Sequence, residues 1–135
     1  MNEKYVMESS VQNDPSYQKF VKENPSVGFL KIRASSAYAA VPVSGIRVKV
    51  LKKIGEMNVI FFEGETDESG MINDIRLPSP KGVLSDEDVP SHTEYELKVN
   101  GSVQNIEREF FVSIFPGITV IQYINITPIM DEIVR

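Results

Sequence analysis

The chain has 135 residues, of which 41% are hydrophobic and 24% are charged, and this composition is typical of one globular domain with one core. Its net charge is −5 and its basic residues are scattered, so the sequence disfavours nucleic acid and anionic membranes as partners. It contains no cysteine, which excludes a disulfide framework, a thiolate zinc site and a cysteine nucleophile.

The first segment, residues 1–13, is polar and has no hydrophobic period, so it is expected to be a loose arm. It has no apolar h-region, and a secretory signal is therefore not expected. The absence of a signal predicts a cytoplasmic location.

A short helix is predicted at about residues 15–24. Asp14 can cap its first turn, Pro15 suits the first helical position, and Pro25 ends it. A helix of this length is not stable alone, so its apolar stripe is expected to dock on the body of the chain or on a neighbour. The stripe, a candidate interaction site, consists of Tyr17, Phe20 and Val21.

From residue 28 onward the hydrophobic period changes to two, which is typical of strands with one buried face. The pattern predicts strands at 28–34, 46–50, 58–66, 71–77, 93–99, 106–115 and 118–127. Short strands separated by turn signals, without helical crossovers, predict an all-β fold, a seven-stranded antiparallel β-sandwich. The predicted core includes Leu30, Ile32, Ile46, Val48, Val50, Tyr95, Leu97 and Val99.

The acidic stretch GETDESGMI, residues 64–72, lies between two of these strands and is interpreted as a turn. The Asp67 side chain can accept hydrogen bonds from backbone N–H groups, and Gly70 can adopt the left-handed conformation. A calcium loop is the alternative, but it needs six or more oxygens at set spacing. Only Glu65, Asp67 and Glu68 are near, so no metal or cofactor is expected.

Three further features carry weaker hypotheses. His92 is the only histidine, so neither a catalytic triad nor a two-histidine metal site can be built from one chain. The acidic cluster Asp86, Glu87 and Asp88 is expected to be a solvated loop tip, with weak calcium binding as the alternative. Tyr38 lies in the loop 35–45, where it either covers the core or stacks on a sugar ring.

The order of several motifs resembles the carboxypeptidase regulatory-like domain, a transthyretin-like (prealbumin-like) sandwich. In chain order these motifs are PVSGIRVKV, GETDESGMI, LPSP, YELKV and YINITP, and the resemblance covers residues 28–128. The preceding FVKENPSVGFLKI is similar to versions of the domain in spore-forming Firmicutes, some of them beside cell-wall or spore-cortex lytic domains. The implied organisation is an arm and helix at 1–25, the sandwich at 26–129 and a tail at 130–135.

The transthyretin-like fold also includes an enzyme, 5-hydroxyisourate hydrolase, and resemblance to it implies several histidines, an arginine and a C-terminal Tyr-Arg-Gly-Ser. This chain has one histidine and ends Met130-Asp131-Glu132-Ile133-Val134-Arg135. Since that set is missing, the chain is expected not to be an enzyme.

The function expected from the sequence is a non-catalytic interaction or assembly module associated with cell-wall or spore-cortex machinery. A protein partner is expected, and edge strands or the N-terminal arm are candidates for homo-oligomer contacts. A spore- or wall-associated location is the alternative to a cytoplasmic one. The alternative function is a wall-glycan-binding module, against which the absence of tryptophan counts.

Overall fold

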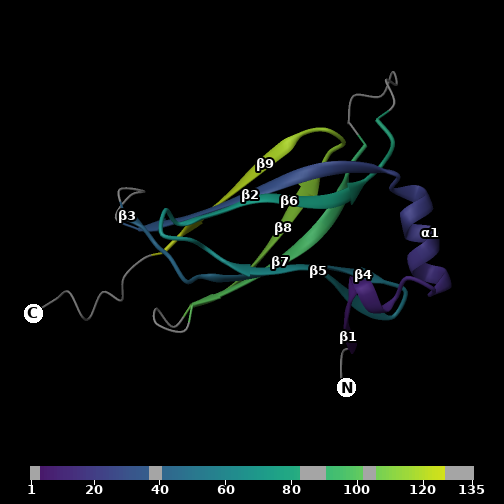
Figure 1. Ribbon diagram of the computed structural model, residues 1–135, viewed down its shortest axis with the longest axis horizontal. Helices are drawn as coiled ribbons and strands as arrows, with labels where there is room; N and C mark the ends of the chain where they lie inside the picture. The colour runs from purple at the N-terminus through teal and green to yellow at the C-terminus, as the bar shows by residue number, and fades with distance from the viewer. Residues whose placement is uncertain (1–3, 37–40, 83–90, 102–105, 127–135) are drawn as a thin grey trace, which may run out of the picture.

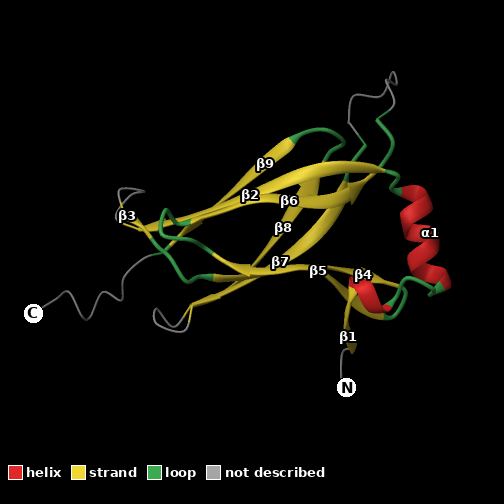
Figure 2. Cartoon of the chain, in the orientation of Figure 1, coloured by secondary structure: helices red, strands yellow, loops and turns green. Residues whose placement is uncertain are grey.

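The computed structural model describes residues 4–36, 41–82, 91–101 and 106–126. Within these ranges two β-sheets pack face to face, and one α-helix lies across one end (Figures 1 and 2). The helical segments are η1 (Glu8–Ser10), a 3₁₀ turn, and α1 (Pro15–Glu23). The strands are β1 (Lys4–Met7), β2 (Ser26–Ser36), β3 (Val41–Pro42), β4 (Arg47–Ile54), β5 (Met57–Glu65), β6 (Met71–Ser79), β7 (Thr93–Gly101), β8 (Ile106–Ile114) and β9 (Thr119–Asn125).

The larger sheet has the strand order β1-β5-β4-β7-β8, and in the smaller sheet β2 pairs with β3, β6 and β9. This arrangement confirms the predicted all-β sandwich. Two pairings are parallel, however: β1 with β5, and β2 with β9. A period of two shows which face of a strand is buried and carries no information about strand direction, so the sequence could not reveal these pairings.

The core lies between the two sheets, and all eight residues predicted for it are at most 2% exposed. In β4 the apolar Val48 and Val50 point inward, while Arg47 and Lys49 point outward. A register shift between Val50 and Leu51 lets both of these neighbours be buried. Burial of side chains of this size contributes roughly 1.5–3 kcal/mol each before ordering costs.

Helix α1 closes one end of the sandwich. The Asp14 carboxylate accepts hydrogen bonds from the backbone N–H groups of Ser16 (2.8 Å) and Tyr17 (3.2 Å), which caps the first turn. Tyr17 and Phe20 are buried, whereas Val21 is 40% exposed and does not dock on the body of the chain; docking of Val21 on a neighbour stays a prediction. Successive helical residues are turned about 100° apart, which carries Val21 away from the sheet beneath Phe20.

The segment expected to be a loose arm contains β1 and η1. Strand β1 extends the larger sheet at its edge, beside β5. The Tyr17 hydroxyl donates a hydrogen bond to the Glu8 carboxylate (2.7 Å) and so links η1 to the helix. The pattern missed this strand because its residues do not alternate: Tyr5, Val6 and Met7 are all apolar. No helix in the part of the chain that the structure describes is long and apolar enough to cross a membrane.

Candidate functional site

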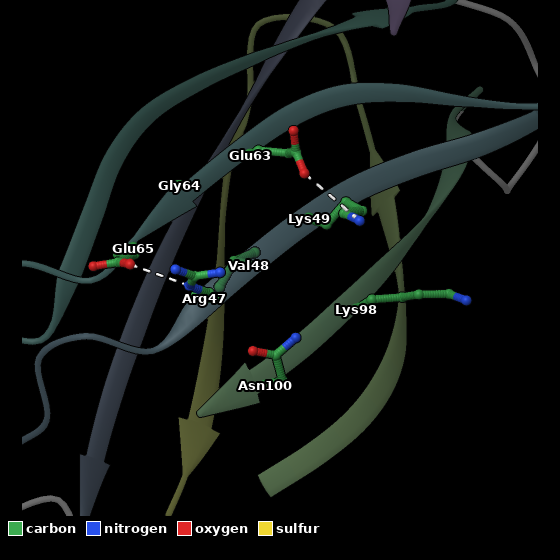
Figure 3. A pocket seen from close by; sticks show the side chains of 8 residues that line it. All are labelled: Arg47, Val48, Lys49, Glu63, Gly64, Glu65, Lys98 and Asn100. Atoms are coloured by element: carbon green, nitrogen blue, oxygen red, sulfur yellow. Dashed lines mark hydrogen bonds and ion pairs between the residues drawn. The ribbon is translucent and has the colours of Figure 1, made fainter. Parts of the chain in front are cut away.

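A polar groove lies on the outer face of the larger sheet, over β4, β5 and β7 (Figure 3). Its volume is about 430 Å³, which is within the range of small-molecule sites. The groove is lined by Arg47, Val48, Lys49, Glu63, Gly64, Glu65, Lys98 and Asn100.

The charged residues of the groove come together because neighbouring strands are held in a fixed register. Alternate residues of a strand share one face, and antiparallel partners lie directly opposite one another. Two parallel rows of side chains therefore cross the sheet from β5 to β8. One row is Glu65, Arg47, Asn100 and Glu107, and the other is Glu63, Lys49, Lys98 and Glu109.

Each of the two β4 cations that line the groove forms an ion pair with a carboxylate on β5 (Figure 3). Arg47 Nε lies 3.2 Å from Glu65 Oε2, and Lys49 Nζ lies 3.6 Å from Glu63 Oε2. All four side chains are well exposed, and exposed pairs typically stabilise a fold by about 0–1 kcal/mol. The ion pairs therefore contribute little to stability, and their main effect is to hold charges of both signs at one surface.

Lys98 brings a third cation, from β7. Its ammonium donates a hydrogen bond to the Tyr5 hydroxyl (3.0 Å), and this bond raises the pKa of Lys98. The same ammonium lies 5.3 Å from the centre of the Tyr5 ring and 4.0 Å from Glu109 Oε2. Lys98 is therefore a stable cation at neutral pH, and β1 places an aromatic ring against it.

The groove continues toward β8 into a second hollow of about 410 Å³. Lys98 and Asn100 line both hollows, so one polar surface extends from β5 to β8. The second hollow is lined by Lys98, Val99, Asn100, Glu107, Arg108 and Glu109.

The acidic stretch singled out in the sequence lies beside the groove as a turn. The Asp67 carboxylate accepts hydrogen bonds from the backbone N–H groups of Ser69 and Met71, both at 2.9 Å. Gly70 has a φ of +73° and donates its N–H to the Asp67 carbonyl (2.9 Å). Among the described residues no cluster of histidine and carboxylate side chains could hold a metal ion.

The other predicted site residues do not meet at the groove. Tyr17 and Phe20 are buried, and Val21 is exposed on the helix. The His92 ring lies 5.3 Å from the ring of Phe115. Tyr38 and the cluster Asp86, Glu87 and Asp88 lie outside the described residues.

The sequence patterns did not reveal the groove. Alternation in residues 46–50 indicates only that Arg47 and Lys49 face away from the core, which the structure shows for this strand. The informative signal was that charged residues are spaced two apart in three strands. That these residues form one surface becomes clear only when the strands are aligned so that Arg47 pairs with Glu65 and with Asn100.

No family model matches the chain, and no curated protein matches it. Among solved structures it is similar to that of Klebsiella pneumoniae 5-hydroxyisourate hydrolase, with 15% sequence identity and a TM-score of 0.47. The similarity covers 75% of this chain and 90% of the other. The strand order shows a sandwich of two β-sheets, and the expected resemblance to a transthyretin/prealbumin-like domain stays a prediction.

This comparison corrects two expectations drawn from the sequence. The chain was expected to be a non-catalytic module and not an enzyme, but the similar solved structure is that of an enzyme. The prediction was wrong in its reasoning, because missing residues of one catalytic set do not exclude other chemistry on the same fold. A similarity of this size does not itself assign an activity to this chain.

Proposed function

We propose that the protein binds a small organic anion in the groove on the outer face of the larger sheet. The observation that carries the proposal is the convergence of Arg47, Lys49 and Lys98 on one hollow of ligand size. Arg47 and Lys49 have carboxylate partners at 3.2 and 3.6 Å, whereas the Lys98 ammonium is 4.0 Å from its nearest paired carboxylate. Lys98 thus has the longest ion pair of the three cations.

The groups around Lys98 indicate which anion would fit. The Arg47 guanidinium can present a planar fork to a carboxylate, and the Asn100 amide can both donate and accept. Glu63 and Glu65 supply acceptors for hydroxyl or N–H groups of the ligand. The preferred ligand class is therefore a small carboxylic acid that also carries hydrogen-bond donors.

The proposal is tested by titrating the full chain with citrate while backbone amide shifts are recorded by NMR. Shift changes should be concentrated at Arg47, Lys98 and Asn100. Lys98→Ala should weaken binding by about tenfold or more, which corresponds to about 1.4 kcal/mol. Lys53→Ala removes the same charge from β4 outside the groove and is the matched control. Equal weakening in both variants, or scattered shifts, would reject the site.

Catalysis is tested separately, with the compound named for the similar structure. Hydrolysis of 5-hydroxyisourate by the full chain is followed with the same variants. Turnover that is lost in Arg47→Ala and in Lys98→Ala, but kept in Lys53→Ala, would place the reaction in the groove. Turnover unaffected by all three variants would place it elsewhere.

Within the transthyretin-like sandwiches, we propose that the chain belongs to the carboxypeptidase regulatory-like branch. The turn between Asp67 and Gly70 supports this, since the resemblance rests partly on that motif. The kinship with spore-forming Firmicutes, the cytoplasmic or spore- and wall-associated location and the protein partner stay predictions. Imaging a fluorescent fusion in a sporulating host would test the location.

A further inference from the structure

The outer face of the smaller sheet has a different character from the groove. In β2 the outward residues are Val27, Phe29, Lys31 and Arg33, because their neighbours Gly28, Leu30 and Ile32 are buried. The parallel register sets Lys31 beside Ile121 and Arg33 beside Tyr123 of β9. Cationic and apolar side chains therefore stand in adjacent pairs on what is called here the β2–β9 face: Val27, Phe29, Lys31, Arg33, Ile121 and Tyr123.

Large apolar side chains are exposed on the β2–β9 face. Tyr123 is 58% exposed, and Val27 and Ile121 are each 44% exposed. Exposed apolar residues that occur singly need no explanation, but contiguous ones mark interaction sites. The register makes Ile121 and Tyr123 neighbours on one strand face, so they form part of one surface.

The cations of the β2–β9 face also differ from those of the groove. Arg47, Lys49 and Lys98 each have a carboxylate within 4.0 Å. Within the described ranges, Lys31 and Arg33 have neither an ion pair nor a side-chain hydrogen bond. In a chain whose net charge is −5, the two cations of this face thus lack an ion-pair partner among the described residues.

We propose that the β2–β9 face docks an extended segment of a partner protein in which apolar side chains alternate with carboxylates. The carboxylates would pair with Lys31 and Arg33, and the apolar side chains would cover Ile121 and Tyr123. In an extended segment of this pattern the carboxylates all point to one side and the apolar side chains to the other. Lying edge-on along the face, it would direct one row to Lys31 and Arg33 and the other to Ile121 and Tyr123, whose members are likewise two residues apart. This surface is separate from the groove and does not depend on ligand binding there.

The test uses an eight-residue synthetic peptide in which leucine alternates with glutamate, and a matched peptide in which glutamine replaces glutamate. The full chain is titrated with each, and backbone amide shifts are followed. The acidic peptide should change the backbone amide shifts of β2 and β9, and it should bind more tightly than the glutamine peptide. Arg33→Glu and Tyr123→Ser should each weaken it about tenfold, while Lys53→Glu, the same charge reversal on the other sheet, should not.

Several results would overturn the proposal. These are absence of binding, equal affinity for both peptides, or shifts confined to the groove. Binding to phosphatidylserine vesicles that Arg33→Glu abolishes would identify a membrane as the occupant. A dimer lost in Arg33→Glu, seen by light scattering, would identify a second copy. Nuclear Overhauser contacts between residues 127–135 and Tyr123 in the free protein would identify this segment of the same chain as the occupant of the face.

Discussion

Tyr95 and Pro78 join the two sheets of the sandwich through one hydrogen bond. The Tyr95 hydroxyl, on β7, donates to the Pro78 carbonyl, on β6, at 2.5 Å. Tyr95 is fully buried, and its ring packs edge-on against the ring of Phe61 (5.4 Å between centroids). Phe61 in turn contacts Phe20 of α1 (5.7 Å). One residue thus connects both sheets and, through Phe61, the helix.

Replacing this hydroxyl tests its contribution directly. Tyr95→Phe keeps the ring but leaves the Pro78 carbonyl without its donor, so the free energy of unfolding should fall by about 1–3 kcal/mol. Tyr123→Phe removes a hydroxyl from an exposed ring, so it should change the free energy of unfolding by less than about 0.5 kcal/mol. Urea denaturation of both variants measures the difference. Equal losses would show that the bond across the sandwich does not contribute.

The turn that contains Gly70 can be probed with a matched glycine. Gly70 and Gly117 both have φ of +73°, so alanine at either position costs about 1–2 kcal/mol. A Cβ at Gly70 would lie 2.3 Å from the Ala34 carbonyl oxygen, whereas a Cβ at Gly117 meets nothing within 4 Å. Gly70→Ala should therefore be clearly more destabilising than Gly117→Ala in thermal melts. Similar melting temperatures would mean that the turn relaxes around the added methyl group.

Calcium should have no effect on this turn. Asp67 Oδ1 already accepts hydrogen bonds from two backbone N–H groups, and no group of three histidine or carboxylate side chains that could hold a metal ion occurs among the described residues. We expect the melting temperature to be the same with and without millimolar calcium. A stabilisation that disappears in Asp67→Asn would revive the metal interpretation.

The helix contributes to stability through one face only. Phe20→Ala should lower the free energy of unfolding by about 3–5 kcal/mol, because the buried ring leaves a cavity beside Phe61. Val21→Ala should change it by less than about 0.5 kcal/mol, since Val21 is 40% exposed. Deletion of residues 1–24 should lower the melting temperature at least as far as Phe20→Ala. An unchanged melt for the deletion would show that α1 docks without stabilising the sandwich.

Alkaline pH should destabilise the fold through two tyrosines. Burial raises the pKa of Tyr95, and burial together with the bond to Glu8 raises the pKa of Tyr17, so both phenols resist ionisation in the folded state. In the unfolded chain each titrates near pH 10. Their stabilising contribution is therefore complete below about pH 10 and is lost as the pH rises above it.

The measurement compares the free energy of unfolding of the wild type and Tyr17→Phe from pH 8 to 11. The variant should lose less stability above pH 10. Burial lowers the pKa of Lys52, which gives a slope of the opposite sign, but the comparison cancels this contribution because both proteins contain Lys52. Parallel curves would show that Tyr17 ionises equally in both states.

The sequence predicted the parts of the fold that depend on one strand or one helix at a time. Leu97 and Val99 were assigned to the core because burial on a sheet follows a period of two, and the helix was located because Asp14 and Pro15 act within one turn. The groove could not be located in this way. Arg47 meets Glu65 and Asn100 only through the register of three strands, which no local pattern specifies.

The parallel pairing of β2 with β9 has a consequence for synthesis of the chain. Phe29 of β2 lies opposite Thr119 of β9, so one edge of this central strand stays uncovered until nearly the whole domain has left the ribosome. Contacts between such distant positions close large loops and slow folding. During that interval one edge of β2 has unpaired backbone N–H and C=O groups, and such an edge favours aggregation of the incomplete chain.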